Sequence, residues 1–503
     1  MILPRKIERV LLIHAPVRLP AETMKVASPP LGAAYLAAAI RDEAEVRIMD
    51  AAGESNHQHE LDKGFTWYGV PLTEIGRRVT EFKPDLVGIT CLFSSVWPVV
   101  KEVAREIRRI DSSIVTAAGG THPSFLAQEC LQEPALDLIC IGEGEQALRE
   151  IVRRSRDGRP LNDLDGIAYK EDGRVAVNPR TRWIEDLDTL PFPARDLLPM
   201  EVYRKEGVPH SLSISGRAFA PMITSRGCPA HCIYCSSTRF WGSRCRFRSP
   251  ENVLDEIGEL IGKWGIEEIQ FEDDNLTADR ARAKAIFRGI SERGYKIKFN
   301  FPNGVALWTL DEELVEIMIE AGCYEMTLAF ESGCQEVLSK IVKKPLNLEK
   351  AERITRHIHS TGLRTDAFYI LGFPGETREQ VKETIAFAHR MKTDMAYFFI
   401  ANPLPGAQMY EIVRERGLLP PGFNFEDLSY SHATFQRGDF APGELERLAH
   451  RAFLHHTFLS FLRRPRVFLR RFFLDLLLKR PRYTLGILVR IWRRNFGGRR
   501  SVG

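Results

Sequence analysis

Apolar runs alternate with amphipathic segments over the first 150 residues. Short apolar runs, typical of buried strands, cover 10–13, 45–49, 86–90, 114–117 and 138–141. Helical patterns lie between them, at 31–40, 72–82 and 99–110, and another begins at Gln146. This alternation predicts a doubly wound, Rossmann-like parallel sheet over 1–150, whose ligands bind at the carboxyl ends of the strands.

A second alternating stretch starts near residue 216. Its predicted strands are 221–225, 267–272, 297–301, 324–330, 365–371 and 395–401, and its predicted helices are 251–263, 278–292, 311–320, 348–361 and 377–390. Six strands with intervening helices predict an open, partial (β/α)6 barrel over 216–405. Residues 151–215 are expected to form a connector, with a hairpin at 167–177 and an extended proline segment at 190–194.

Three cysteines follow the first barrel strand. Cys228, Cys232 and Cys235 have the spacing CxxxCxxC, and three thiolates can hold three irons of a four-iron cluster, leaving the fourth iron open. Structural zinc normally takes four ligands in two pairs, and the next cysteine, Cys245, has no CxxC partner. A disulfide framework is also not expected, because the chain is long, has nine cysteines and shows no secretion signal. The loop therefore predicts a 4Fe-4S cluster in preference to a zinc site or unrelated buried cysteines.

This spacing resembles that of the radical S-adenosylmethionine (SAM) superfamily. The resemblance implies that SAM binds the open iron and that one electron, from a donor of the flavodoxin or ferredoxin type, cleaves it to methionine and a 5′-deoxyadenosyl radical. It places Tyr234 beside the adenine of SAM. It also implies SAM contacts at the later strand ends, which are Asp273 and Asp274 for the ammonium, Glu331 and Ser332 for the ribose and carboxylate, and Gly372, Pro374 and Gly375 for the adenine.

The strand ends of the first domain are rich in glycine and short hydroxyl side chains, which let backbone approach a ligand closely. No GxGxxG follows the first strand, so a dinucleotide is not indicated. The order Ser-Pro-Pro-Leu-Gly (28–32), Gly-Gly-x-His (119–122) and Gly-Glu-Gly-Glu (142–145) resembles the cobalamin-binding domain fused to many radical SAM proteins. The contacts that this resemblance implies for cobalamin are Ser94, Ser95, Gly119, Gly120, Thr121, His122, Gly142, Glu143 and Gly144.

The DxHxxG motif, which supplies a histidine to cobalt in other cobalamin proteins, is absent, and Asp-Ala-Ala-Gly stands at 50–53. The resemblance then implies cobalamin without a protein histidine on cobalt. His14 and His122 are the histidines nearest to strand ends, and we interpret both as loop histidines bonded to backbone. The alternative for the whole domain is a degenerate doubly wound module that binds nothing.

Charge separates the end of the chain from the rest. The composition, 44% apolar and 27% charged, is that of a folded globular protein with a net charge of +4. Residues 451–500 carry +13, however, which leaves −9 on the remainder. We expect 406–503 to form a helical, basic region in which the segment 466–480 has Arg466, Arg470, Asp475 and Lys479 on one stripe and Phe or Leu elsewhere.

Such a helix either packs on the body or lies in a membrane interface, and we favour packing. Nucleic acid is not expected as a partner, because the tail offers Phe and Leu in place of polar base-reading groups. No stretch approaches the roughly 20 apolar residues that span a bilayer. We therefore expect a cytoplasmic protein, with peripheral contact to the inner face of the membrane through 451–500 as the alternative.

Taken together, these features predict a cobalamin-dependent radical SAM methyltransferase. Methylcobalamin, recharged by a second SAM, would supply a methyl group to an unactivated carbon of a small or apolar metabolite. One alternative keeps both cofactors but performs a radical rearrangement, ring closure or oxidation. A non-enzyme alternative is a membrane-associated carrier of cobalamin or iron–sulfur clusters. The sequence assigns neither the acceptor nor any catalytic residue beyond the cofactor sites.

Overall fold

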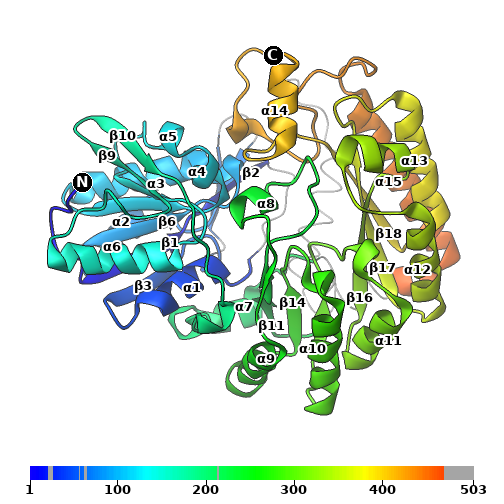
Figure 1. Ribbon diagram of the computed structural model, residues 1–503, viewed down its shortest axis with the longest axis horizontal. Coiled ribbons are helices and arrows are strands. Elements are labelled where there is room, and N and C mark those ends of the chain that lie inside the picture. The colour runs from blue at the N-terminus through cyan, green and yellow to red at the C-terminus, as the bar shows by residue number, and fades with distance from the viewer. Residues whose placement is uncertain (21–26, 56, 62–64, 212–214, 470–503) are drawn as a thin grey trace.

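The structure, a computed structural model, describes residues 1–20, 27–55, 57–61, 65–211 and 215–469 (Figure 1). An N-terminal α/β domain lies beside a larger α/β half-barrel. The C-terminal helices lie against the half-barrel. The predicted α/β class and the order of the two domains are confirmed.

The first domain contains a seven-stranded sheet in the order β10-β9-β8-β7-β6-β1-β3. Its parallel strands are β1 (Arg9–His14), β3 (Glu45–Asp50), β6 (Leu86–Thr90), β7 (Val115–Gly119) and β8 (Leu138–Cys140). The second parallel strand of the chain, β3, lies outside β1, and the third, β6, lies on the other side of β1. In doubly wound sheets of this order, ligands bind where the order reverses, which here is between β1 and β6.

Helices cover both faces of this sheet. α1 (Leu31–Ile40) and α6 (Glu145–Asp157) pack together on one face, and α2 (Leu72–Phe82) and α3 (Trp97–Ile110) pack together on the other. The predicted strands and long helices of this domain are all present. Two short helices after β7, α4 (Thr121–Phe125) and α5 (Ala127–Cys130), were not predicted.

The predicted hairpin forms as β9 (Ile167–Glu171) and β10 (Arg174–Asn178), and β9 pairs antiparallel with β8. It therefore extends the first sheet instead of standing alone in a connector. After it come the 3-10 turns η3 (Leu187–Thr189) and η4 (Arg195–Leu197) and the helix α7 (Met200–Glu206). A small sheet of β2 (Val17–Pro20), β5 (Phe65–Tyr68) and β4 (Gln58–Glu60) was also missed, because β4 has only polar residues and Arg18 interrupts the apolar positions of β2.

The half-barrel contains the six predicted strands. β11 (Phe219–Met222), β14 (Glu268–Phe271) and β15 (Lys298–Asn300) form one parallel sheet, and β16 (Glu325–Glu331), β17 (Arg364–Leu371) and β18 (Met395–Ile400) form the next. Parallel bridges between Phe299 and Cys323 and between Val305 and Leu328 join the two sheets. The outer helices are α9 (Pro250–Trp264), α10 (Arg280–Glu292), α11 (Glu312–Ala321), α12 (Leu348–Ser360) and α13 (Arg378–Met391).

The C-terminal region contains α14 (Gln408–Glu415), α15 (Glu444–Arg463) and α16 (Pro465–Leu469). α15 packs against β18 and buries Leu445, Ala449, Ala452 and His456. The beginning of the basic tail thus lies on the body, while most of the predicted 466–480 stripe falls outside the described residues. In the part of the chain that the structure describes, no helix is long and apolar enough to cross a membrane.

Candidate active site

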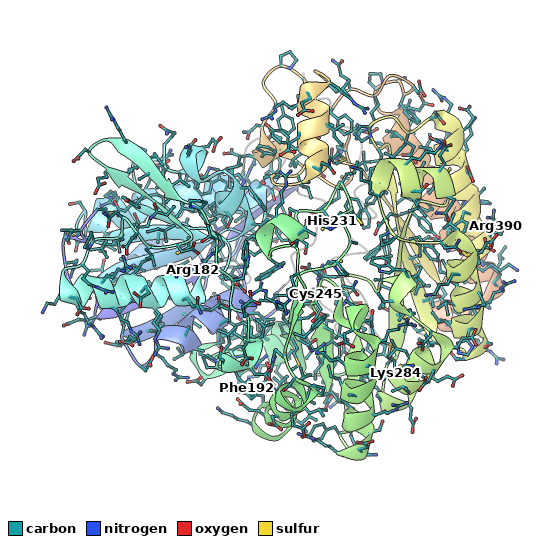
Figure 2. All side chains as sticks on the ribbon, in the orientation of Figure 1. Arg182, Phe192, His231, Cys245, Lys284 and Arg390 are labelled. Atoms are coloured by element: carbon teal, nitrogen blue, oxygen red, sulfur yellow. The ribbon has the colours of Figure 1, made fainter. Side chains whose placement is uncertain are left out.

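The three cysteines lie on a loop that a short ribbon closes at both ends. β12 (Ser225–Arg226) precedes the loop and pairs antiparallel with β13 (Arg246–Phe247) after it. Figure 2 places His231 and Cys245, both on this loop, in the middle of the molecule. The amide of Ser237, at the start of α8 (Ser237–Phe240), donates to Cys235 Sγ at 3.4 Å, and Asn275 Nδ2 donates to Cys228 Sγ at 3.7 Å.

Asp273 holds the start of this loop. Its carboxylate accepts hydrogen bonds from the Thr224 amide at 3.0 Å, from Thr224 Oγ1 at 2.8 Å and from Ser225 Oγ at 2.5 Å. Because these groups occupy the buried carboxylate, Asp273 anchors the loop instead of facing a ligand. Asp274, by contrast, is exposed and accepts from Ser237 Oγ at 2.6 Å, so it remains the candidate for the SAM ammonium.

Glu331 binds Tyr234, which the sequence analysis named, and Lys344, which it did not. Its Oε1 accepts from Tyr234 Oη at 2.8 Å and from Lys344 Nζ at 2.8 Å. The side chains of Glu331 and Lys344 are 8% and 3% exposed, so this is a buried ion pair. Glu331 has a φ of 66°, an unusual backbone conformation for a residue with a side chain, at the irregular end of β16. Ser332 lies behind it and is bonded to Thr384 of α13 at 2.9 Å.

The turn after β17 lies next to Tyr234. The ring of Phe373 is 5.9 Å from that of Tyr234, which brings the predicted adenine contacts Gly372, Pro374 and Gly375 to the cysteine loop. Glu376 fastens the turn by accepting from the amides of Gly372 at 2.7 Å and Phe373 at 3.0 Å. Burial raises the pKa of Glu376 to about 7.

The predicted contacts of the first domain gather at one edge of its sheet. Ser94 and Ser95 begin the turn η2 (Ser94–Val96) after β6, Gly119 ends β7 and Gly120 follows it, and Gly142 and Gly144 follow β8. His122 Nδ1 lies 2.9 Å from Ser94 Oγ, which joins the first two of these loops. Next to them Leu92 and Phe93 are 58% and 53% exposed, so this edge presents apolar surface as well as backbone.

Comparison with known proteins shows the same division of the chain. A model of the B12-binding domain matches residues 17–152, and a model of the radical SAM superfamily matches residues 222–388. The chain is 32% identical over 471 residues to cytidylyl-2-hydroxyethylphosphonate methyltransferase of Streptomyces wedmorensis, covering 88% of each chain. It is a cobalamin-dependent radical SAM methyltransferase.

Two further comparisons agree. An uncharacterized methyltransferase of Pyrococcus horikoshii is 31% identical over 470 residues, which cover 93% of this chain and 95% of that protein. The structure of the radical SAM methyltransferase TsrM from Kitasatospora setae, with tryptophan and a SAM analogue bound, superposes with a TM-score of 0.65 at 21% identity. This match covers 81% of this chain and 76% of the TsrM chain, and it shows that the two share a fold.

The methyltransferase uses a 4Fe-4S cluster, SAM and cobalamin, and Cys228, Cys232 and Cys235 remain its predicted cluster ligands. All nine cysteines are free thiols, so the three on the loop are available as ligands. Burial raises the pKa of the Cys228 thiol, and raises those of Cys232 and Cys235 to about 11 and about 12. Without iron these thiols are therefore protonated, and cluster binding releases their protons.

At the strand ends of the first domain, where cobalamin contacts are predicted, the loops pack closely on one another. Gly120 has a φ of 114°, and a Cβ added there would lie 2.5 Å from the Cys91 carbonyl oxygen, so only glycine fits this close approach. His122 is buried, and burial lowers its pKa to about 4, so its ring is neutral. We expected both histidines near strand ends to bond to backbone, but they bond to side chains. His14 Nδ1 lies 2.6 Å from Asp50 Oδ1, and His122 Nδ1 lies 2.9 Å from Ser94 Oγ.

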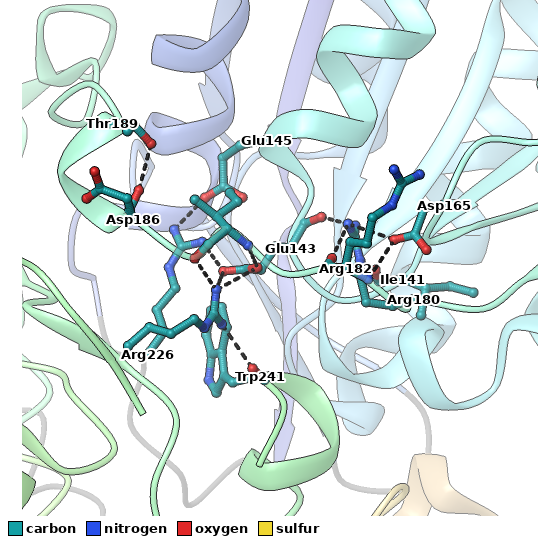
Figure 3. A network of polar contacts seen from close by, with 12 residues as sticks. Ile141, Glu143, Glu145, Asp165, Arg180, Arg182, Asp186, Thr189, Arg226 and Trp241 are labelled. Atoms are coloured by element: carbon teal, nitrogen blue, oxygen red, sulfur yellow. Dashed lines mark hydrogen bonds and ion pairs between the residues drawn. The ribbon is translucent and has the colours of Figure 1, made fainter. Parts of the chain in front are cut away.

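Glu143 departs most from its predicted role. Its carboxylate, expected near cobalamin, pairs with both Arg226 and Arg246, which flank the cysteine loop. Figure 3 shows Glu143 beside Arg226. Glu145, which begins α6, pairs through Oε1 with the second terminal nitrogen of Arg226, Nη2, at 2.5 Å. The sequence analysis did not single out either arginine or Lys344. Arg226 stands two residues before Cys228, but a basic residue in such a place is also common on solvated surfaces.

Proposed function

We propose that this enzyme methylates an unactivated carbon of an acceptor that carries a planar, aromatic-sized ring. The observation that carries the proposal is an aromatic inner face of the half-barrel, formed by Phe368, Tyr397, Phe399 and Tyr430. The curated relative from Streptomyces wedmorensis is named for a cytidylyl acceptor, whose base is a ring of this kind. Bound SAM and methylcobalamin supply the radical and the methyl group, and the protein holds the acceptor between them.

Side chains alternate between the two faces of a strand, and this alternation points these rings toward the inside of the half-barrel. Phe398 stacks on Tyr369 in the outer core, with ring centroids 5.4 Å apart, so its neighbours Tyr397 and Phe399 point to the opposite, inner face. Phe368 on β17 contacts both of them, at 5.9 Å and 5.4 Å. A Cβ added at Gly304, after β15, would lie 3.6 Å from the Phe368 ring, so this ring reaches across toward the opposite sheet.

Tyr430 extends the aromatic face toward the cluster. Its ring is 6.1 Å from that of Phe399, and its carbonyl accepts from the Ile400 amide at 2.9 Å. The side chain is 55% exposed, while burial of its hydroxyl raises the pKa of Tyr430, an effect to which Cys235 of the cysteine loop adds. Tyr430 is therefore accessible and lies near a predicted cluster ligand.

Polar groups lie across from these rings. Glu272, which follows β14, is bonded through Oε2 to His210 Nδ1 and Asn303 Nδ2, both at 3.1 Å. The His210 side chain is 48% exposed, with its Nδ1 fixed by the carboxylate. An acceptor with a flat apolar side and a hydrogen-bonding edge is complementary to these two walls.

The test counts the products of SAM. Reconstituted enzyme is incubated with reductant, methylcobalamin, SAM and either cytidylyl-2-hydroxyethylphosphonate or the same phosphonate without the nucleotide. Methyl transfer gives S-adenosylhomocysteine and 5′-deoxyadenosine together, and we expect both only with the ring-bearing acceptor. 5′-Deoxyadenosine alone would indicate a rearrangement, and neither product with any ring-bearing acceptor would contradict the proposal.

A pair of variants tests the aromatic face itself. Phe399→Leu removes an inner ring, and we expect KM for a ring-bearing acceptor to rise about tenfold, since one stacked ring is worth about 1 kcal/mol or more. Phe398→Leu removes the neighbouring ring on the outer face and is the matched control. It should lower the unfolding temperature without changing KM. Equal effects on KM would remove the aromatic face as the acceptor site.

We also infer a peripheral membrane contact through α15, and an electron donor of the flavodoxin or ferredoxin type. Leu454, Phe458, Phe461 and Leu462 are 51%, 59%, 39% and 59% exposed on one side of α15. The exposed charges beside these apolar residues are the basic Arg451 and Arg463. This surface would attract an anionic lipid surface and repel a basic protein segment.

Vesicle sedimentation of the full chain decides this contact. We expect salt-sensitive binding to phosphatidylglycerol vesicles that Leu454→Glu/Phe458→Glu abolishes. Gln128→Glu/Gln132→Glu, at exposed positions on the first domain, changes the net charge equally and is the control. Unchanged sedimentation of the α15 variant would contradict a lipid-binding role for this helix.

A further inference from the structure

We propose that Glu143 is a positioning residue that fixes the cysteine loop against the cobalamin domain. The consequence for methyl transfer rests on the function proposed above. The arrangement of the loop does not, because it follows from the contacts around Glu143 alone. Figure 3 shows Glu143 and Glu145 meeting Arg226 where the two domains join.

The two arginines control both ends of the loop. Arg226 and Arg246 are directly paired residues of the ribbon β12–β13, and all three cluster cysteines lie between them in the sequence. One carboxylate binds both guanidinium groups. Any shift of Glu143 relative to the half-barrel therefore moves the start and the end of the cysteine loop together.

The hydrogen bonds of Glu143 use the whole carboxylate. Oε1 accepts from Arg226 Nη1 at 2.6 Å and from Arg246 Nη1 at 2.8 Å, and Oε2 accepts from Arg246 Nη1 at 2.9 Å and from the Ile184 amide at 3.0 Å. An ionised carboxylate has about four lone-pair sites. These bonds fill them, so Glu143 has no acceptor left for cobalamin.

The surroundings leave this joint little freedom. The side chains of Glu143, Arg226 and Arg246 are 0%, 6% and 3% exposed. The Arg226 guanidinium lies between the rings of Tyr35 and Trp241, at 5.6 Å and 5.1 Å, and Arg246 also donates to the carbonyls of Trp241 and Ile184.

The loop that carries Glu143 is equally constrained. A Cβ added at Gly144 would lie 2.8 Å from a methyl group of Leu36 in α1. The carboxylates of Glu143 and Glu145 balance the two buried arginine charges, so the joint is neutral as well as tightly packed. A joint of this kind resists sliding of one domain on the other, because sliding would leave buried charges without their partners, which costs free energy.

Glu143→Gln tests the role, since it keeps the shape but removes the charge that pairs with both arginines. The matched control is Glu133→Gln. Glu133 is a buried glutamate of the same domain, and its ion pair with Arg105 does not involve the cysteine loop. Each variant is reconstituted with iron, sulfide and hydroxocobalamin. Bound cofactors are then quantified, and the reduced cluster is examined by electron paramagnetic resonance with and without SAM.

We expect Glu143→Gln to retain cobalamin and iron but to show a changed cluster spectrum with SAM. Methylated product per 5′-deoxyadenosine should fall about tenfold to a hundredfold, because small misplacements of reacting groups have effects of this size. The control should match the wild type in both. Loss of cobalamin with an unchanged cluster spectrum would overturn the proposal in favour of direct cofactor contact, and so would a variant identical to wild type.

Two provisions keep the test decisive. If Glu143→Gln does not fold, Arg226→Lys keeps the charge but loses the two-pronged donor that binds Glu143 and Glu145, and the same spectral change is expected from it. An unchanged spectrum would then overturn the proposal. The cluster spectrum needs no acceptor. A failed methylation assay therefore counts against the proposed function, while the spectrum still decides the role of Glu143.

Discussion

The two strand-end edges of this enzyme are built in opposite ways. At the half-barrel edge, charged groups are buried in pairs, as in Glu331 with Lys344, and polar groups anchor the cysteine loop through Asp273. At the edge of the first domain, the predicted contacts other than His122 and the ion-paired Glu143 are glycines and short hydroxyl groups, with Leu92 and Phe93 exposed beside them. The half-barrel edge is thus held by bonds within the protein, whereas the other edge offers backbone and apolar surface to a large ligand.

The largest expected effect comes from replacing the predicted cluster ligands at the half-barrel edge. Replacing Cys228, Cys232 and Cys235 together by Ala should abolish the iron–sulfur absorbance after anaerobic reconstitution, because thiolates are the usual ligands of such clusters. Cys140→Ala is the control and should leave this absorbance intact. A triple variant that still holds about four irons per chain would show that the cluster lies elsewhere.

The next effect separates buried charge from a half-buried hydroxyl group. Glu331→Ala leaves Lys344 buried without its partner, so the unfolding free energy should fall by about 3 to 5 kcal/mol. Adding Lys344→Met should restore part of this loss. Ser94→Ala, at the other edge, removes one neutral hydrogen bond and should cost about 1 kcal/mol. Urea unfolding measures all of them, and similar losses at both edges would erase the contrast.

The two edges should also respond to pH with opposite signs. Glu376 has a folded pKa of about 7, raised by burial, so its contribution to stability is full below about pH 4.5 and is lost as the pH rises through 7. His122 has a folded pKa of about 4, lowered by burial, so its contribution is full above about pH 6.5 and is lost as the pH falls through 4. Each shift corresponds to about 3 kcal/mol.

Differences between each variant and the wild type isolate these two contributions. Relative to wild type, Glu376→Gln should gain in unfolding free energy as the pH is raised from 4.5 to 8. His122→Gln should gain as the pH is lowered from 6.5 to 4. Chemical denaturation across this pH range is the measurement. Parallel pH profiles for a variant and the wild type would mean that the replaced group does not titrate as its burial requires.

The smallest effect distinguishes two adjacent glycines at the cobalamin edge. Gly120→Ala forces a side chain into a backbone conformation with φ at 114° and against the Cys91 carbonyl, and we expect a loss of about 1 to 3 kcal/mol with weaker cobalamin binding. Gly119→Ala meets its nearest atom at an ordinary 3.6 Å and should be tolerated. Thermal unfolding and cobalamin absorbance report both, and equal behaviour would contradict the steric account.

Sequence patterns predicted the elements well because their signal is local. The period of apolar residues places α2 over Leu72–Phe82 and β6 over Leu86–Thr90 just as the structure has them. The partners of charged residues could not be predicted in this way. Gly-Glu-Gly-Glu has the same sequence whether it binds a ligand or an arginine, and its partner Arg226 is 83 residues away. Asp273 was likewise chosen for the right loop and the wrong role, because only the folded chain shows that Thr224 and Ser225 occupy it.

The joint at Glu143 also has a consequence for how the chain is made. The first sheet is complete once Asn178 has been synthesised, before Arg226 and Arg246 leave the ribosome. Domains generally fold as units during synthesis, N-terminal part first. The nascent chain therefore displays Glu143 and Glu145 as a hydrated acidic pair, which attracts the arginine ribbon when it emerges.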